Sequence, residues 1–417
     1  MTATTRDHTL LELIGMLVDP AARPDPYPVY ARIRELGPSV LDLPLWQTPG
    51  AVISSYQGCE AVLRDPRMSS QRGRDRNLAD LMPPGAPSSV RQRWFLSLDA
   101  PDHTRLRRLV SAAFTARRIG RLSERIAGLV DELLDRAAER DGPFDIVEDL
   151  AYPLPMTVIC EMLGVPAADQ EQVREWSSRL TRLIDGFGAP PTEESISGLL
   201  ALNVYLNELI ASRQARPGDD LISALTAVRE GGDSLSHDEL VSIVALLLVA
   251  GHETTVNLIA NGALALLRHP EHLAALRESP RAPELAEAVV EETLRYDPPV
   301  HITARVATED MELSGVRLRR GAMVVLLLAA AHRDPRETEK PDVFDPYRPE
   351  IKHLAFGLGP HFCLGAPLAR LEARLALTRL AQRLPEPVLL QDPPPYRDHV
   401  NLRGPLSITV PRPSLLT

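Results

Sequence analysis

Apolar residues recur at three- and four-residue spacing along most of this chain, and this spacing predicts amphipathic helices. The segments that show it are residues 105–114, 119–140, 168–183, 193–214, 237–267, 284–295 and 364–384. Strand-like runs are short and few, at residues 40–45, 51–54, 311–313, 322–328 and 406–410. We therefore expect a mainly α fold with small β-sheets, formed by one domain over residues 1–417, of which residues 1–24 are loosely ordered.

Two stretches between these segments follow neither pattern. Residues 68–94 are basic and contain several prolines, and residues 333–352 are rich in proline and charge. Long irregular segments in a compact domain are often functional. We expect residues 68–94, together with the glycine- and proline-containing residues 185–196, to be lids over a binding site; ordinary surface loops are the alternative.

The charge and the apolar runs argue against two classes of partner. The net charge is −10 and no segment is dense in Lys or Arg, so the footprint of a nucleic-acid-binding protein is missing. The most apolar run, residues 242–251, is followed by His252 and Glu253 and is shorter than the roughly 20 residues that span a bilayer. The N-terminal residues resemble no signal peptide. We expect a cytoplasmic protein that binds neither nucleic acid nor membrane.

The three cysteines do not form a disulfide framework. Cys59, Cys160 and Cys363 are odd in number, widely separated and contain no C-x-x-C pair, which also argues against a zinc ribbon. Cys363 differs from the other two because it lies among glycines and prolines in AFGLGPHFCLGAPLAR, residues 355–370. This context calls for a specific explanation.

Glycines on both sides of Cys363 predict an unusual backbone. Gly357 and Gly359 allow positive φ and close approach of a flat ligand, and we expect Gly365 to do the same after the cysteine. Pro367 predicts the first turn of a helix. A thiolate at that point would face the positive end of the helix dipole, which lowers the pKa of the thiol.

This loop has three other possible interpretations. Phe362 stands where a dinucleotide-binding fingerprint needs its third glycine, so that interpretation fails. His361 and Cys363 are too few ligands for zinc. A buried, inert cysteine is the commonest role of a lone Cys, but the flanking glycines disfavour it here.

The pattern F-G-x-G-x-H-x-C-x-G, formed by residues 356–365, resembles the haem-binding signature of the cytochrome P450 family at every fixed position. The resemblance implies the fold of that family, with haem b between a long central helix and the loop that carries the cysteine. It implies that Cys363 is the axial ligand, a thiolate that pushes electron density onto the iron. It also implies that Phe356 packs near the sulfur.

The long apolar segment 237–267 contains an unusual centre. Ala250, Gly251, Glu253 and Thr254 resemble the family's A-G-x-[DE]-T stretch. The resemblance implies that Gly251 leaves room for dioxygen, and that Glu253 and Thr254 relay protons to it, which is general acid catalysis. The alternative is a glycine for helix packing and a hydroxyl bonded to the preceding turn.

Glu292 and Arg295 in E-E-T-L-R are three residues apart on one helical face. As a bare pattern this pair is weak, because most such pairs lie at the surface and contribute under about 1 kcal/mol. In the family the pair lies between the oxygen-binding helix and the cysteine loop and is joined by another arginine, which maps to Arg348. The resemblance implies a structural triad.

Cationic side chains should also converge on the two haem propionates. The resemblance assigns this role to His103, Arg107, Arg305 and His361. A further basic group has two interpretations, a solvated face, which we favour, or a patch that steers an acidic electron donor. Its members are Arg105, Arg108, Arg117, Arg118 and Arg121.

The resemblance implies insertion of one oxygen atom from O₂ into a mid-sized hydrophobic molecule, by hydroxylation or epoxidation, in bacterial secondary metabolism. Electrons would come from NAD(P)H through a separate ferredoxin and ferredoxin reductase, because the chain shows no flavin fingerprint and too few cysteines for an iron–sulfur cluster. A monomer is expected. The implied pocket lining is Leu246, Val249, Ala250, Val300, Ile302, Thr303, Asn401 and Leu402.

Other functions remain open. A peroxide-driven peroxygenase would keep Cys363 but has less need of Glu253 and Thr254. A haem sensor would usually carry an output domain. A catalytically silent haem-binding relative is the third alternative, and turnover with a ferredoxin system would separate it from a monooxygenase.

Overall fold

The computed structural model describes residues 3–43, 48–71, 88–91, 94–185, 192–229, 231–278, 282–384 and 388–411. The chain divides into two compact units. Unit 1 consists of Met1–Met68, Ser123–Leu154 and Thr254–Thr417, and unit 2 consists of Ser69–Leu122 and Pro155–Glu253.

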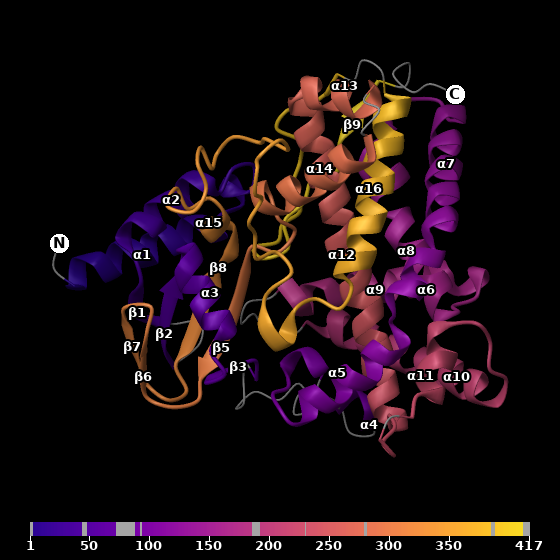
Figure 1. Cartoon of the computed structure of the whole chain (residues 1–417), viewed down its shortest axis with the longest axis horizontal. Coiled ribbons are helices and arrows are strands. Elements are labelled where there is room, and N and C mark those ends of the chain that lie inside the picture. The colour runs from indigo at the N-terminus through magenta and orange to yellow at the C-terminus, as the bar shows by residue number, and fades with distance from the viewer. Residues whose placement is uncertain are drawn as a thin grey trace. The chain divides into compact units, whose positions relative to one another are not determined.

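Unit 1 contains helices that pack along their length. They are α1 (Ala3–Val18), α2 (Tyr27–Leu36), α3 (Tyr56–Arg64), α7 (Ser123–Glu139), α13 (Pro270–Glu278), α14 (Ala282–Tyr296), α15 (Leu328–His332) and α16 (Ala366–Arg383). Helix α16 lies beside α7, α13 and α14, and Figure 1 shows α14 and α16 side by side. The apolar stripe of α7, which includes Ile126, Val130 and Leu134, is buried, as its spacing predicts.

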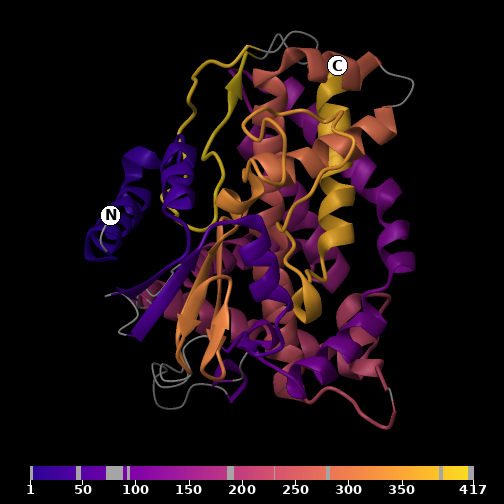
Figure 2. The same ribbon diagram turned by 60° about the vertical axis from the view of Figure 1, so that its left-hand side comes forward.

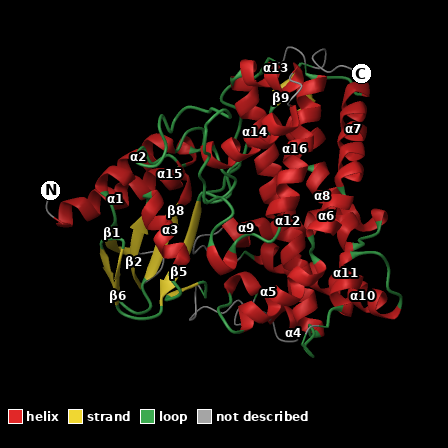
Figure 3. Cartoon of the chain, viewed as in Figure 1, coloured by secondary structure: helices red, strands yellow, loops and turns green. Residues whose placement is uncertain are grey.

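The strands of unit 1 are few (Figure 3). One sheet has the order β1-β2-β8-β5-β3, formed by β1 (Ser39–Leu43), β2 (Thr48–Ile53), β8 (Met323–Leu327), β5 (Ile302–Ala307) and β3 (Met68–Ser69). Strands β2 and β8 are parallel, whereas β5 and β8 are antiparallel; Figure 2 shows the sheet from a second side. Ala304 of β5 lies opposite Val325 of β8. Strand β5 thus has a fixed register against the centre of the sheet.

Two strand pairs complete unit 1. They are β4 (Phe144–Asp145) with β9 (Thr409–Val410), and β6 (Met311–Leu313) with β7 (Val316–Leu318). The β6–β7 turn has positive φ at Ser314 and Gly315, 52° and 77°, which suits the twist of a two-residue hairpin. The core beside the sheet includes Cys59, which is fully buried, and burial raises the pKa of its thiol. Cys59 is therefore a packing residue.

Unit 2 is helical in its described residues. It holds α4 (Ser88–Arg91), α5 (Asp102–Ala113), α6 (Ala116–Arg121), α9 (Gln170–Asp185), α10 (Glu193–Ala215) and α11 (Leu221–Ala227). Helix α10 begins with a capping box between Thr192 and Ser195. It packs closely on α9 at Gly198, where an added Cβ atom would lie only 2.9 Å from Cβ of Arg179. Glycine therefore permits this contact.

The unit boundary falls inside strand β3 and inside two helices, α8 (Pro153–Leu163) and α12 (His237–Arg268). Helix α12 is long and apolar enough to span a membrane by length and composition, but 78% of its most apolar window is buried inside the protein. The core helix of a folded domain meets the same criterion. Cys160 of α8 is fully buried, which raises the pKa of its thiol to about 12.

The helices expected from apolar spacing are present, with bounds that differ by a few residues. One expectation is wrong, because residues 119–140 form two helices, α6 and α7. They are separated at Leu122, whose N–H bonds to the carbonyl of Ile119 in a tight turn. Residues 333–352 contain no helix or strand, as predicted.

Some expectations stay predictions. Most of residues 68–94 and residues 186–191 lie outside the described residues, so the two lids are untested. Helix α1 occupies most of residues 1–24, and their loose order stays a prediction, as does the single domain. Strand β5 was not anticipated.

Candidate functional site

The backbone of the loop that carries Cys363 agrees with the prediction at two of its three glycines. Gly357 and Gly359 both have φ of +70°, a conformation that side chains rarely adopt. A Cβ atom at Gly359 would also lie 3.1 Å from the carbonyl oxygen of Leu63. The loop closes when the N–H of Cys363 donates to the carbonyl of Phe356 at 2.9 Å. Helix α16 follows, with Pro367 as its second residue.

Gly365 does not behave as expected. Its φ of −79° and ψ of −1° are ordinary right-handed values, so positive φ is not the reason for glycine here. A Cβ atom at this position would lie 3.9 Å from the Cys363 sulfur. Glycine therefore keeps the space beside the sulfur open, and its conformational freedom is not used.

The residues around Cys363 fit a metal centre that brings its own ligands. Cys363 is exposed, whereas Cys59 and Cys160 are buried. Within the described residues no group of three or more His, Cys, Asp or Glu side chains could hold a metal ion. A structural or catalytic ion held by protein ligands alone would need such a group. A haem iron, which brings four porphyrin nitrogens, would need only one accessible thiolate from the protein. Cys363 has the accessibility for this role, and its assignment as the ligand stays a prediction.

Helix α12 presents one accessible face. Between residues 240 and 267 every side chain is buried except those at Leu247, Ala250, Gly251 and Thr254, which are half-buried. Steps of three, one and three residues place these positions on one face of the helix. The small residues and the hydroxyl that the family motif singles out therefore lie on the accessible face, where a ligand could contact them.

Glu253 lies off this face. It is 4% exposed, and its Oε1 is 3.4 Å from Nε2 of the fully buried His252. Nδ1 of His252 is 2.9 Å from the carbonyl oxygen of Leu248, one helical turn earlier. The Glu253 carboxyl therefore lies next to the imidazole of His252. The family motif assigns no role to His252.

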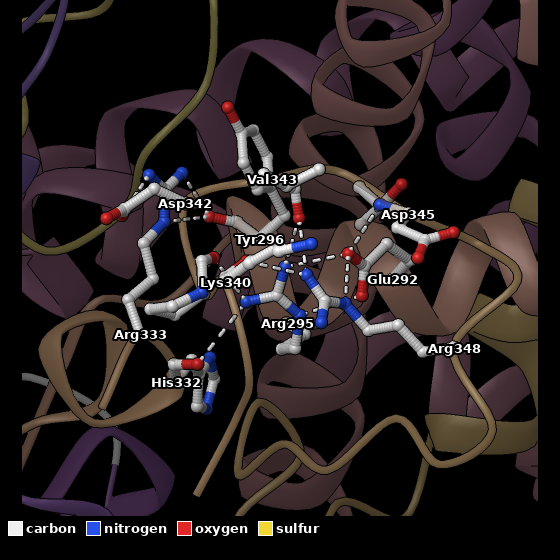
Figure 4. A network of polar contacts seen from close by, with 12 residues as sticks. Glu292, Arg295, Tyr296, His332, Arg333, Lys340, Asp342, Val343, Asp345 and Arg348 are labelled. Atoms are coloured by element: carbon white, nitrogen blue, oxygen red, sulfur yellow. Dashed lines mark hydrogen bonds and ion pairs between the residues drawn. The ribbon is translucent and has the colours of Figure 1, made fainter. Parts of the chain in front are cut away.

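The carboxylate of Glu292 is at the centre of a buried network (Figure 4). Nε and Nη2 of Arg295 both donate to it at 2.7 Å, and both side chains are fully buried. Nε of Arg348 donates to Glu292 at 3.1 Å, and the backbone N–H of Asp345 donates at 2.8 Å. The structure thus brings the three predicted triad residues together.

The two arginines use their other N–H groups to hold the irregular segment 333–352. Arg295 donates to the carbonyl oxygens of Pro341 and Val343 at 2.8 and 3.0 Å (Figure 4). Arg348 donates to those of Lys340 and Val343, both at 2.8 Å. A loop with no helix or strand satisfies its carbonyls through these side chains. The network therefore links α14 to the segment that leads to the Cys363 loop.

Two segments predicted to line the pocket lie together in unit 1. Val300 pairs with Leu402 in a β-bridge, and the side-chain oxygen of Asn401 accepts the N–H of Ile302 at 2.9 Å. Thr303 is half-buried beside them on β5. Asn401 therefore fixes the backbone of the segment that precedes Arg305.

Of the three lining residues predicted on α12, Ala250 lies on the accessible face, whereas Leu246 and Val249 are covered by protein. Leu246 and Val249 expose 4% and 0% of their surfaces. Ile302, Asn401 and Leu402 of the first group are buried to a similar degree. Leu247, which was not predicted, is accessible in their place. The assignment of Leu246 and Val249 to the pocket stays a prediction.

The four cationic residues are distributed over both units. His103 and Arg107 lie four residues apart on α5 in unit 2, and burial, with a smaller contribution from Arg107, lowers the pKa of His103. Arg305 is buried on β5 of unit 1, where it donates to the carbonyl of Ala304 at 2.8 Å. His361 ends a short turn ahead of Cys363. Their convergence on one ligand stays a prediction.

A buried polar cluster in unit 1 was missed. Asp297 accepts hydrogen bonds from Tyr27 and Arg403, both at 2.7 Å, and its Oδ1 is 3.6 Å from Nε2 of His301. Burial raises the pKa of Asp297, but Arg403, His301 and Tyr27 outweigh burial and hold it well below its ordinary value. Its members lie on α2, after α14 and near the C-terminus, so no local spacing connects them.

The chain is similar to known proteins over nearly its whole length. The family model for Cytochrome P450 matches residues 201–407. Cytochrome P450 monooxygenase PikC of Streptomyces venezuelae is 43% identical, with 92% of this chain and 89% of that protein covered. Vitamin D(3) 25-hydroxylase of Pseudonocardia autotrophica is 41% identical, with 91% and 92% covered.

The fold is shared as well. The ligand-free crystal structure of Mycobacterium smegmatis CYP164A2 matches with a TM-score of 0.84 at 46% identity, and the match covers 96% of this chain and 99% of that chain. Identity above 40% over nine-tenths of the length confirms both the family resemblance and the expected fold. Relatives named monooxygenase and hydroxylase establish an enzyme of the same reaction class. The chain is an oxidoreductase that belongs to the cytochrome P450 family.

Proposed function

We propose that this enzyme inserts one oxygen atom from O₂ into a mid-sized hydrophobic molecule, by hydroxylation or epoxidation, with Cys363 as the axial ligand of haem b. Family membership implies haem with a thiolate ligand. The accessibility of Cys363 in its glycine-shaped loop is the observation that supports its assignment as that ligand.

The haem, when bound, supplies the oxygen chemistry: in a hydroxylation a substrate C–H becomes C–OH, the second oxygen atom leaves as water, and two electrons and two protons are consumed. We assign the electrons to NAD(P)H, delivered through a separate ferredoxin and its reductase. The chain itself binds, orients and delivers protons.

The accessible face of α12 suits the oxygen side of this reaction. Ala250 and Gly251 have little or no side chain, so they leave space, and the Thr254 hydroxyl on the same face can donate a hydrogen bond. Glu253 and His252 are buried next to each other, one and two residues before Thr254. We propose that protons pass from this pair to Thr254, which delivers them by general acid catalysis.

The substrate class rests on the pocket residues and on the relatives. Val300, Ile302 and Leu402 are apolar, and Thr303 and Asn401 are the polar residues beside them, which suits a hydrophobic molecule with few polar groups. Two relatives are named for the molecules they oxidise, vitamin D(3) 25-hydroxylase and nocardicin C N-oxygenase. We place this enzyme in bacterial secondary metabolism, in the cytoplasm.

The ligand assignment is tested by the absorption of the reduced carbon-monoxide complex. Wild-type protein should show the band near 450 nm that marks thiolate ligation, and Cys363→His should lose it while Cys160→Ser, a buried cysteine elsewhere, keeps it. Survival of the band in Cys363→His would refute the assignment. Product formed with NAD(P)H and a ferredoxin system, and not only with peroxide, separates a monooxygenase from a peroxygenase or a silent relative.

A further inference from the structure

The first acid of E-E-T-L-R, Glu291, has its own set of partners, separate from the triad. Nε and Nη2 of Arg370 on α16 donate to its two oxygens at 2.6 and 2.9 Å. Nε2 of His353, in the loop before Cys363, lies 3.0 Å from Oε2 of the same carboxylate. Glu291 thus joins α14, α16 and the loop, and a two-point bond fixes the plane of the Arg370 guanidinium.

The charge state of this group is set by its contacts. Burial raises the pKa of the Glu291 carboxyl, but His353 and Arg370 outweigh burial and lower it to about 2. Nδ1 of His353 accepts the N–H of Ala355 at 3.3 Å, so the hydrogen on Nε2 is the one donated to Glu291. At neutral pH Glu291 is therefore a carboxylate that orients both partners.

Both partners of Glu291 contact the Phe356 ring. The guanidinium carbon of Arg370 lies 4.5 Å from the ring centroid, within cation–π distance. The His353 ring meets it in a T-shaped arrangement at 6.0 Å between centroids. The carbonyl of Phe356 accepts the N–H of Cys363 at 2.9 Å. A continuous set of contacts therefore leads from Glu291 through Phe356 to the backbone of the cysteine.

We propose that Glu291, Arg370 and His353 are positioning residues that hold the Phe356 ring against the Cys363 loop, and so set the reduction potential of the bound haem. The proposal rests on the proposed function, because it takes Cys363 as the ligand. In this proposal, a ring held in place would limit water near the sulfur. Water that hydrogen-bonds to a thiolate stabilises its charge and weakens its donation to iron, which favours the reduced metal.

The test is the reduction potential of the haem-loaded protein, with Arg370→Leu as the deciding variant. If the pair acts by positioning, releasing the ring makes reduction at least threefold more favourable, a positive shift of about 30 mV at 59 mV per tenfold for one electron. If only charge matters, Arg370→Leu leaves the negative Glu291 unpaired and the potential shifts to more negative values. A negative shift, or none, would overturn the proposal.

Glu291→Gln should also shift the potential to more positive values. A charge effect alone predicts this too, so the variant is combined with Phe356→Leu. Under positioning, Glu291→Gln adds nothing once the ring is removed, because the two changes act through one contact. An undiminished shift in the Phe356→Leu background would contradict the proposal.

Two further variants guard against a general loss of structure. Arg383→Leu is the matched control, because Arg383 is on the same helix and pairs with Asp135 of α7 at 2.9 Å; it should leave the potential unchanged. Arg370→Lys keeps the positive charge but loses the planar two-point bond to Glu291. It replaces Arg370→Leu as the deciding variant if that variant does not fold. Positioning predicts a positive shift of the reduction potential for Arg370→Lys, whereas a charge effect alone predicts no shift. A wild-type protein without the 450 nm band would refute the proposed function instead.

Discussion

Two groups of arginine and carboxylate side chains illustrate how burial changes the role of one chemical pair. In unit 1, Glu292 and Arg295 are fully buried, and each is bonded to further partners. In unit 2, Arg105 of α5 pairs with Asp233 and Glu239, and about a third of the Arg105 and Asp233 side chains is exposed. Removing a partner strands a buried charge in the first group and admits water in the second.

The difference separates structural roles from electrostatic ones. The buried group connects α14 to carbonyl groups of an irregular segment, so its geometry holds the chain. In the exposed group, Arg105 and Arg108 pair with Asp233, and Arg105 also pairs with Glu239, so the charge of these two arginines is partly neutralised within their own unit. This supports the interpretation of that basic group as a solvated face.

The largest effect is expected from Arg295→Ala. The change leaves Glu292 buried and removes the donors to Pro341 and Val343. The free energy of unfolding should fall by about 3–5 kcal/mol, the usual cost of breaking a buried pair. Urea unfolding followed by circular dichroism, with haem content measured in parallel, checks both stability and haem retention. A loss below about 1 kcal/mol would place this pair with the exposed ones.

A change of pH tests the buried polar groups of unit 1 without removing a side chain. Burial lowers the pKa of His301 to about 4, although Asp297 opposes this. The unfolded chain takes up this proton below about pH 6.5, whereas the folded protein does so only near pH 4, so stability falls as the pH falls through this window. Between pH 7.5 and 5.0 His301 alone should remove about 2 kcal/mol.

His301→Gln is the control for that pH dependence. The variant should flatten the change in urea midpoint between pH 7.5 and 5.0, because no proton is taken up at this position. His332 contributes in the same direction, since burial holds its pKa well below the ordinary value, so a residual slope is expected. An identical slope in wild type and variant would show that His301 is not the titrating group.

Much of the candidate site could be predicted because its signals are local. The Cys363 loop is a contiguous run of glycines and one cysteine, and Glu292 and Arg295 are three residues apart on one helix. Helices α10, α12 and α16 are long enough for their spacing to be unambiguous. These features depend on neighbours within about four residues.

The missed features depend on distant partners. Strand β5 forms by pairing with β8, about 20 residues later in the chain. The Asp297 cluster depends on a hydrogen bond from Arg403, near the C-terminus. Glu291 and Glu292 are adjacent in sequence, yet successive helical residues point about 100° apart, so one carboxylate faces Arg370 and the other Arg295. The sequence alone gives no reason to assign the two acids to different partners.

The smallest effect is expected from Arg105→Gln. The ion pairs with Asp233 and Glu239 are partly exposed, so the free energy of unfolding should fall by less than about 1 kcal/mol, and the difference should shrink further in 0.5 M salt. Urea unfolding at low and high salt measures this, with the exposed Arg117→Gln as the matched control on the neighbouring helix α6. The prediction would be contradicted if Arg105→Gln lowered the free energy of unfolding as much as Arg295→Ala at either salt concentration. Exposure would then not explain the difference between the two groups, and the network around Glu292 would have no distinct structural role.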